Sequence, residues 1–238
     1  MQLRSVALAL ALPLALAACT RAQSAPRPAP PARETGSVTA PAAPVADEPT
    51  GVTQPAPPAP AGLSEATFAG GCFWCLEASF ERVNGVRAVL SGYTGGREEH
   101  PSYDAVSNHG TSHAEAIRVH FDPAVVTYEQ LLDHFWRHIE PTAQDRAFVD
   151  VGRQYRSVIF VHNPAQRAAA ERSKQALAAS GRFREPIVTP IEDAAVFWVA
   201  EDYHQDFYRT HPDRYQSYHE HSGRREFLRA HWGPDADY

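Results

Sequence analysis

Two cysteines three residues apart are the side chains of this chain best placed to do chemistry. Cys72 follows two glycines, and Cys75 comes one helical turn later. A short apolar strand is predicted just before them, at residues 66–69, and a helix at 72–82. A thiol in the first turn of a helix faces unpaired backbone N–H groups and the positive end of the helix dipole. Both favour the reactive thiolate, so the pair predicts a redox or nucleophilic site.

The same pair has three other interpretations. A zinc site needs four ligands, usually including a second cysteine pair or a histidine pair. Cys19 is the only other cysteine, although His219 and His221 lie close together near the end of the chain. Two small thiols buried at a helix start would be purely structural. A thioredoxin-like disulfide exchanger also carries C-x-x-C at a helix start, but Phe73 and Trp74 are bulky residues to find between its cysteines.

The first eighteen residues are predicted to be a targeting segment. Arg4 supplies a positive charge, and residues 6–18 are apolar but too short to span a bilayer comfortably. The sequence Leu16-Ala17-Ala18-Cys19 resembles the lipobox of bacterial lipoproteins, whose cysteine is lipidated and becomes the first residue of the mature chain. This resemblance implies a membrane-anchored exported protein, and the usual Gram-negative sorting pattern implies the outer membrane, facing the periplasm. The alternative is an ordinary signal peptide with an incidental cysteine.

Residues 19–62 are predicted to form a disordered tether behind the lipidated cysteine. They are rich in Ala and Pro and contain no aromatic residue, so they cannot bury enough apolar surface to offset the entropy of ordering. Residues 63–238 are long enough for one domain with a sizeable core. The formal net charge of −6 argues against nucleic acid as a partner, and we expect a monomer.

The pattern of the globular part favours an α+β fold, because strands and helices mix without a strict βαβ repeat. Residues 115–121 alternate as a strand does, and Thr127 with Gln130 predicts a helix that begins with a capping box. The tail from Ser217 is polar and its structure is ambiguous. The other expected elements are strands at 86–93, 156–161, 188–192 and 196–199, and helices at 101–108, 127–139, 163–181 and after Glu201.

Several ordered motifs accompany the cysteine pair. They are Gly70-Gly71-Cys72-Phe73-Trp74-Cys75-Leu76-Glu77, Gly92-Tyr93-Thr94-Gly95-Gly96, Pro101-Ser102-Tyr103, His113-Ala114-Glu115-Ala116, Tyr128-Glu129-Gln130-Leu131-Leu132, Gln154-Tyr155-Arg156-Ser157 and Ala200-Glu201-Asp202-Tyr203-His204-Gln205. Together they resemble the A-type peptide methionine sulfoxide reductases, over most of the chain from about residue 64 onward.

This resemblance implies both a fold and an activity. The fold would be a two-layer sandwich with a mixed β-sheet, helices packed on it and long irregular connections. The activity would be reduction of methionine S-sulfoxide, free or in proteins, as a repair of oxidative damage. No cofactor would be bound, and an external dithiol, thioredoxin or a thioredoxin-like protein, would supply the electrons.

Reduction of a sulfoxide by a thiol needs a nucleophile and a proton donor beside the oxygen. Cys72 is the natural nucleophile and Glu115 the natural donor. Glu115 shares a predicted strand face with Ile117 and Val119, so its carboxyl should be desolvated and its pKa raised. The alternative is a glutamate at a strand end that reaches solvent or pairs with an arginine such as Arg118. The family's His-Ala-Glu motif favours catalysis.

The resemblance also implies roles for six further residues. Tyrosines matching Tyr103 and Tyr155 hydrogen-bond the sulfoxide oxygen, and rings matching Phe73 and Trp74 receive the substrate methyl group. Without the motifs, these would be ordinary core or surface residues. Asp150 matches an aspartate near the site, although its sequence context differs here, and His204 is expected to give structural support. We expect no metal ligands.

This chain departs from the family at the recycling cysteine. Many members have glycine where this chain has Cys75 and carry recycling cysteines near the C-terminus, whereas residues 210–238 contain none. Residues i and i+3 of a helical turn have Cα atoms about 5 Å apart, which is within disulfide range. The predicted cycle is therefore a Cys72 sulfenic acid, a Cys72–Cys75 disulfide and reduction by the external dithiol. In a rival cycle an external thiol attacks the sulfenic acid directly.

Two other functions remain open from the sequence. A general thiol-disulfide oxidoreductase would use Cys72 and Cys75 but would have no use for Glu115. A lipid-anchored binding protein would use its histidine-rich tail to hold a metal.

Overall fold

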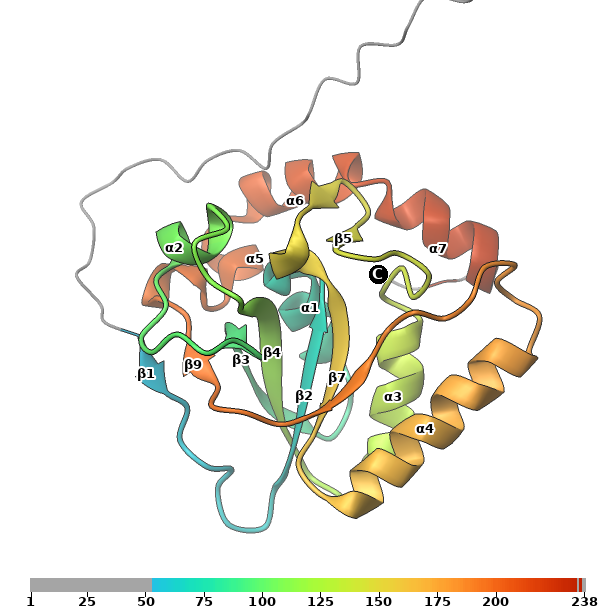
Figure 1. Ribbon diagram of the computed structural model, residues 1–238, viewed down its shortest axis with the longest axis horizontal. Coiled ribbons are helices and arrows are strands. Elements are labelled where there is room, and N and C mark those ends of the chain that lie inside the picture. Colours follow the sequence, from blue (N-terminus) through green and yellow to red (C-terminus); the bar gives the residue numbers. More distant parts are fainter. Residues whose placement is uncertain (1–52, 235, 237–238) are drawn as a thin grey trace, which may run out of the picture. The chain divides into compact units, whose positions relative to one another are not determined.

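The computed structural model describes residues 53–234 and 236 (Figure 1). The predicted signal peptide, Cys19 and the tether up to residue 52 lie outside the described residues. Within the described part of the chain, no helix has the length and apolar character needed to cross a membrane.

A mixed sheet of seven strands forms the centre of the domain, in the order β1-β9-β3-β4-β2-β7-β8 (Figure 1). Neighbouring strands are antiparallel except for β7 and β8, which are parallel. A separate hairpin pairs β5 with β6. The strands are β1 Gln54–Pro55, β2 Ser64–Gly70, β3 Val86–Thr94, β4 Ala114–Phe121, β5 Arg146–Ala147, β6 Asp150–Val151, β7 Ser157–Val161, β8 Ile191–Asp193 and β9 Trp198–Val199.

The helices pack on this sheet, and the predicted α+β class with a mixed sheet is confirmed. Two predicted helix starts are also confirmed. Thr127 and Gln130 form the reciprocal capping box, and Asn163 caps the helix whose first residue is Pro164. The helices are α1 Phe73–Phe80, α2 Tyr103–Ser107, α3 Tyr128–Trp136, α4 Pro164–Ala179, α5 Phe207–Thr210, α6 Pro212–His221 and α7 Arg224–Trp232, with short 3₁₀ turns at η1 Arg153–Tyr155 and η2 Asp202–His204.

The central strand β4 is buried on both faces, which its alternating sequence does not predict. Ile117 and Val119 lie in the main core, on the face predicted to be buried. Arg118 and His120 point to the other face, yet they are only 8% and 4% exposed. The connection from α4 to β9 crosses this face in Figure 1, and the Arg118 guanidinium lies 4.9 Å from the centre of the Phe197 ring. A strand covered on both sides leaves its side chains little contact with water.

The chain already contacts the sheet before residue 63, where the domain is predicted to begin. β1 pairs with β9, the Ala56 N–H donates to the Phe197 carbonyl at 2.7 Å, and the Thr53 hydroxyl donates to the Pro101 carbonyl at 3.0 Å. The chain therefore joins the sheet edge by residue 53. A segment rich in Ala and Pro can do this because an edge strand needs few donors of its own.

The C-terminal tail, ambiguous in sequence, forms the helices α6 and α7 at one end of the sheet (Figure 1). Pro212 stands in the first turn of α6, and Gly223, at φ +72°, separates the two helices. The predicted strand at 188–192 begins only at Ile191, because Pro190 has no N–H to give to a ladder.

Candidate active site

The turn between β2 and α1 places the cysteine pair at the carboxyl end of a central strand. Gly71 adopts φ +88°, which an L side chain rarely tolerates. A Cβ on Gly70 would lie 2.4 Å from the Ile139 Cγ2 atom, so close packing also requires glycine there. Cys72 is the N-cap of α1, and all eight residues of α1 are buried. The catalytic candidates thus stand on a helix fixed inside the core.

A pocket with about 260 Å³ of empty space, partly open to solvent, lies at this turn. Its wall contains seven of the residues singled out from sequence and one that was missed, Tyr218. The lining residues are Cys72, Phe73, Trp74, Tyr103, Glu115, Asp150, Tyr155 and Tyr218. Cys75 does not line the pocket. It is buried beside Cys72, whose carbonyl accepts its N–H at 3.2 Å, and both thiols are free.

Glu115 reaches the pocket from β4 and is only 2% exposed. Its Oε2 accepts a hydrogen bond from the Phe73 N–H at 3.1 Å. Burial raises the pKa of this carboxyl well above its ordinary value, which outweighs the opposing effect of the Phe73 N–H. Pairing with Arg118 is excluded, since that guanidinium lies 3.8 Å from Glu65 on the other face of the sheet. Glu115 therefore holds its proton to higher pH than an exposed glutamate does, and it contacts the start of α1.

Cys72 does not have the environment predicted for it. Burial raises the pKa of its thiol, and Cys75, Glu115 and Asp150 raise it further. The first free N–H of the helix, that of Phe73, points to Glu115 and not to the sulfur. Burial and the neighbouring groups therefore oppose the effect predicted for the helix N-terminus on Cys72.

Trp74 is held by the segment that follows β9. Its indole N–H donates to His204 Nδ1 at 3.1 Å, and its ring stacks on Phe207 with the centres 3.7 Å apart. Burial, and then Arg214, lowers the pKa of His204 to about 3, so the imidazole is neutral and can accept this bond. His204 lies behind the pocket wall, which fits the structural role expected for it.

Tyr103 is fixed by Glu201, which lies two residues after the end of β9. One carboxylate oxygen of Glu201 accepts the Tyr103 N–H and the other accepts the Tyr93 hydroxyl, each at 2.8 Å. Tyr93 in turn packs against the Phe73 ring, with the centres 5.8 Å apart. The Glu-Asp-Tyr-His motif thus holds two sides of the pocket.

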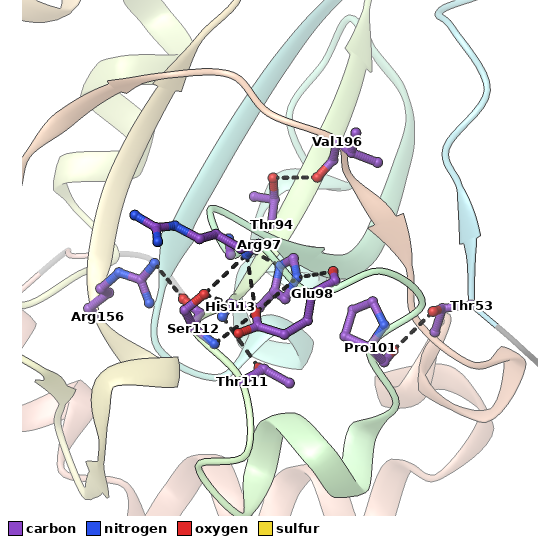
Figure 2. Close-up of polar contacts among 11 residues, drawn as sticks. Thr53, Thr94, Arg97, Glu98, Pro101, Thr111, Ser112, His113, Arg156 and Val196 are labelled. Carbon is purple, nitrogen blue, oxygen red and sulfur yellow. Dashed lines mark hydrogen bonds and ion pairs between the residues drawn. The ribbon is translucent and has the colours of Figure 1, made fainter.

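The loop that leads from β3 towards Tyr103 is closed by a second polar cluster (Figure 2). Glu98 Oε2 accepts hydrogen bonds from the Ser112 N–H at 3.0 Å and the Ser112 hydroxyl at 2.9 Å. His113 Nδ1 accepts the Gly96 N–H at 3.2 Å, and Arg156 donates to the Ser112 carbonyl at 3.2 Å. Sequence reasoning missed this cluster, which secures the chain just before Glu115.

Asp150 lies on β6 and accepts a hydrogen bond from the hydroxyl of Tyr218, a residue of α6. Burial raises the pKa of Asp150, while Tyr218 and Arg224 oppose that rise. Sequence reasoning missed Tyr218 and Arg224 because the tail was not assigned. The signal was present: Tyr215 and Tyr218, and Arg224 and Leu228, have helical spacing on either side of a glycine.

The zinc interpretation finds no support in residues 53–234 and 236, where no group of three or more His, Cys, Asp and Glu side chains is arranged to hold a metal. His219 and His221 are two residues apart on the helix α6 and therefore project in different directions.

Comparison with known proteins identifies relatives over the whole described domain. A family model described as "Peptide methionine sulfoxide reductase" matches residues 64–236. The peptide methionine sulfoxide reductase MsrA of Bacillus licheniformis is 49% identical over 172 residues, which is 72% of this chain and 95% of that protein. MsrA of Ligilactobacillus salivarius is 50% identical over 167 residues, 70% of this chain and 96% of that one.

Solved structures give the same result. Reduced Mxr1 from Saccharomyces cerevisiae superimposes with a TM-score of 0.61 at 31% identity, covering 66% of this chain and 90% of that one. Methionine sulfoxide reductase A of Corynebacterium diphtheriae superimposes with a TM-score of 0.57 at 29% identity, and the match covers 67% of this chain and 83% of that one.

The helix that carries the cysteines also contains a buried acid whose ionisation can be tested. Glu77 is 1% exposed, and its Oε1 accepts the Asp206 N–H at 3.1 Å, which ties α1 to the segment before α5. Burial raises the pKa of Glu77 to about 8. The unfolded chain releases this proton near pH 4.3, an approximate value for a free glutamate. The free energy of unfolding should therefore fall as the pH rises from about 5 to about 8, by at most roughly 1.4 kcal/mol per pH unit from this group.

We predict that Glu77→Gln removes this contribution, so that the variant loses less stability than the wild type between pH 5.5 and pH 7.5, approximate limits chosen inside that window. Urea denaturation at both pH values measures the difference. Glu185→Gln, at an exposed position, is the matched control and should follow the wild type. Parallel pH dependence in wild type and Glu77→Gln would contradict a protonated Glu77.

Proposed function

The chain belongs to the peptide methionine sulfoxide reductase family, and from that membership we propose how its pocket carries out the reaction. It is a peptide-methionine (S)-S-oxide reductase, an enzyme of protein repair, so the predicted activity is confirmed. The observation that carries the proposed mechanism is the placement of one buried thiol, Cys72, and one buried neutral carboxyl, Glu115, in the wall of a single pocket.

Cys72 is the nucleophile in this proposal. A sulfoxide sulfur is electrophilic, so a thiolate can attack it directly. The Cys72 thiol gives up its proton as it attacks, and this proton replaces the one that Glu115 gives to the sulfoxide oxygen. Burial raises the pKa of the Cys72 thiol, so its proton leaves only as the sulfur attacks.

Glu115 is the acid. The sulfoxide oxygen is a poor leaving group until it is protonated, and Glu115 retains its proton at neutral pH because it is buried. Tyr103 and Tyr155 stand beside it in the pocket wall. Burial, and then Glu115, raises the pKa of both phenols, so each keeps a proton to donate to the sulfoxide oxygen.

Phe73 and Trp74 supply an apolar surface for the methyl group of the substrate. Both rings are buried. The Trp74 ring stacks on Phe207 and its indole N–H donates to His204, while the Phe73 ring packs against Tyr93. A thioether makes favourable contacts with aromatic rings, and a fixed pocket costs little conformational entropy on binding. Asp150, secured by Tyr218, forms another part of the wall.

Cys75 resolves the intermediate in the cycle we favour. Transfer of oxygen leaves Cys72 as a sulfenic acid and releases methionine. The Cys75 sulfur then bonds to the Cys72 sulfur as the S–O bond of Cys72 breaks. The oxygen departs as water, with the hydrogen of the sulfenic acid and the proton that the Cys75 thiol gives up. The two electrons that restore the thiols come from outside the pocket, so an external dithiol such as thioredoxin is required.

A general thiol-disulfide exchanger is the second candidate, and the pocket argues against it. Disulfide exchange requires only two thiols, whereas here Glu115 and three phenols converge on Cys72 inside the domain. Burial raises the pKa of the Cys72 thiol, which would slow plain disulfide exchange.

The first test is an assay of both methionine sulfoxide epimers with a dithiol reductant. We expect turnover of the S epimer alone, and Cys72→Ser should abolish it because a hydroxyl is a far weaker nucleophile than a thiolate. Substantial turnover by Cys72→Ser, or equal turnover of the two epimers, would contradict the assignment.

The second prediction concerns the acid. Glu115→Gln retains the shape and the bond to Phe73 but has no proton to transfer, so kcat should fall by about 10² to 10⁴. Steady-state kinetics with the S epimer measure the loss, and thermal denaturation checks the fold. A decrease smaller than about fivefold in a folded variant would assign Glu115 to structure.

The third prediction concerns recycling. Cys75→Ser should still convert one equivalent of sulfoxide and then stop at the sulfenic acid, whereas the wild type should finish with a Cys72–Cys75 disulfide. Mass spectrometry after one turnover without reductant separates these products. If the wild type forms no such bond and Cys75→Ser turns over normally with thioredoxin, an external thiol resolves the intermediate.

We also propose that the enzyme is an exported lipoprotein, anchored through Cys19 to the outer membrane and facing the periplasm. The support is the Leu16-Ala17-Ala18-Cys19 sequence after an apolar segment, followed by a stretch rich in Ala and Pro that separates the anchor from the catalytic domain.

The fourth prediction therefore concerns targeting. Cys19→Ala should move the protein out of the membrane fraction or block its maturation, as judged by cell fractionation and the mass of the mature chain. The same membrane association and processing in the variant would overturn the lipoprotein proposal.

A further inference from the structure

The chain runs along the edge of the sheet before it enters the part that matches the family model. That match begins at residue 64, whereas residues 53–56, which we call the strap, already pair with the domain. The strand β1 of the strap is antiparallel to β9, and the Ala56 N–H donates to the Phe197 carbonyl at 2.7 Å (Figure 1). The mechanism described above gives the strap no role.

Thr53 joins the strap to the loop that leads into Tyr103. It is only 4% exposed, and its hydroxyl donates to the Pro101 carbonyl at 3.0 Å (Figure 2). The Thr53 carbonyl accepts a hydrogen bond from His100 Nδ1 at 2.7 Å, and the centre of the His100 ring lies 4.5 Å from that of Trp198 on β9. One residue of the strap thus holds two consecutive residues of the loop, and the second of them stands two positions before Tyr103.

Tyr103 needs such anchors because its own helix is short. It is the first residue of α2, which has five residues, and a helix of that length is not stable by itself in water. The Tyr103 N–H donates to Glu201, which follows the strand that the strap pairs with. The strap and Glu201 therefore hold the main chain at Tyr103 from the same edge of the sheet, and the phenol forms part of the pocket wall.

We propose that the strap is a positioning element for the reaction, in which the Thr53 hydroxyl fixes the place of the Tyr103 hydroxyl at the sulfoxide oxygen. The inference rests on the proposed function, in which Tyr103 donates to that oxygen. Negative charge gathers on the oxygen as Cys72 attacks, so this hydrogen bond is stronger in the transition state than in the bound substrate. A misplaced donor lowers the rate of such a step. Loss of the strap contact should therefore slow the step more than it weakens substrate binding.

The test measures the burst of methionine when reduced full-length enzyme is mixed with excess methionine S-sulfoxide and no reductant. Thr53→Val keeps the shape of the buried side chain, and we expect the burst at saturating sulfoxide to slow by about three- to tenfold, the value of one ordinary hydrogen bond. The sulfoxide concentration that gives half the maximal rate should change less. Thr53→Ser keeps the hydroxyl and should stay close to wild type. Thr210→Val is the matched control, because it removes an exposed hydroxyl that donates to the Asp206 carbonyl at 3.2 Å, and it should behave as wild type.

A second background separates positioning from stability. Tyr103→Phe removes the hydroxyl that the strap places, so adding Thr53→Val to it should slow the burst by less than about twofold. Thr53→Val alone should not slow the burst more than Tyr103→Phe does, because both act through the same hydroxyl. An unchanged burst in folded Thr53→Val, or equal slowing in the two backgrounds, would overturn the proposal.

Two changes at the exposed His100 test the same contact and leave the buried Thr53 in place. His100 has φ +50°, a conformation that glycine and asparagine accept. His100→Gly removes the donor to the Thr53 carbonyl and should slow the burst, whereas His100→Asn supplies an amide N–H and should slow it less. A wild-type burst in His100→Gly would overturn the proposal. Absence of a burst in the wild type would instead refute the proposed function, and a Tyr103→Phe burst as fast as that of the wild type would refute the role that the function gives to Tyr103.

Discussion

Exclusion of water from the Glu115 carboxyl is the constraint on which the site depends. In water a glutamate is ionised at neutral pH and cannot protonate a sulfoxide. Here the carboxyl extends from a strand covered on both faces and meets the first N–H of α1, the helix that carries the nucleophile. One hydrogen bond thus joins the acid to the helix that carries the nucleophile, and burial raises the pKa of the acid. The glycine turn, the stacked rings and the Glu201 contacts fix the positions of these groups.

The same burial creates an electrostatic problem, which the C-terminal helices address. A buried site with two thiols and two carboxyls disfavours every negative charge, yet attack on the sulfoxide requires a thiol to lose its proton. Tyr218 and Arg224, both from the tail, oppose the rise in the pKa of Asp150 that burial causes, Tyr218 with a hydrogen bond and Arg224 with its charge.

Much of the fold could be predicted from sequence because local signals determined it. The capping box at Thr127, the proline after Asn163 and the glycines before Cys72 each specify a boundary that the structure contains. The pocket residues were found through motifs, and seven of them meet in one wall. The features that could not be predicted arise from contacts between segments that are distant in the sequence. Burial of Arg118, the raised pKa of Cys72 and the contribution of Arg224 all depend on segments distant in sequence, and no local pattern reports which segment covers a strand or helix.

The most direct test of this account is the protonation state of Glu115 itself. Infrared difference spectroscopy between wild type and Glu115→Gln near pH 7 would isolate the signal of this carboxyl, and Glu185→Gln would provide the spectrum of an exposed glutamate. The account predicts the carbonyl band of a protonated carboxylic acid for Glu115. Carboxylate bands alone for Glu115 would contradict it, because an ionised Glu115 could not supply the proton that releases the sulfoxide oxygen.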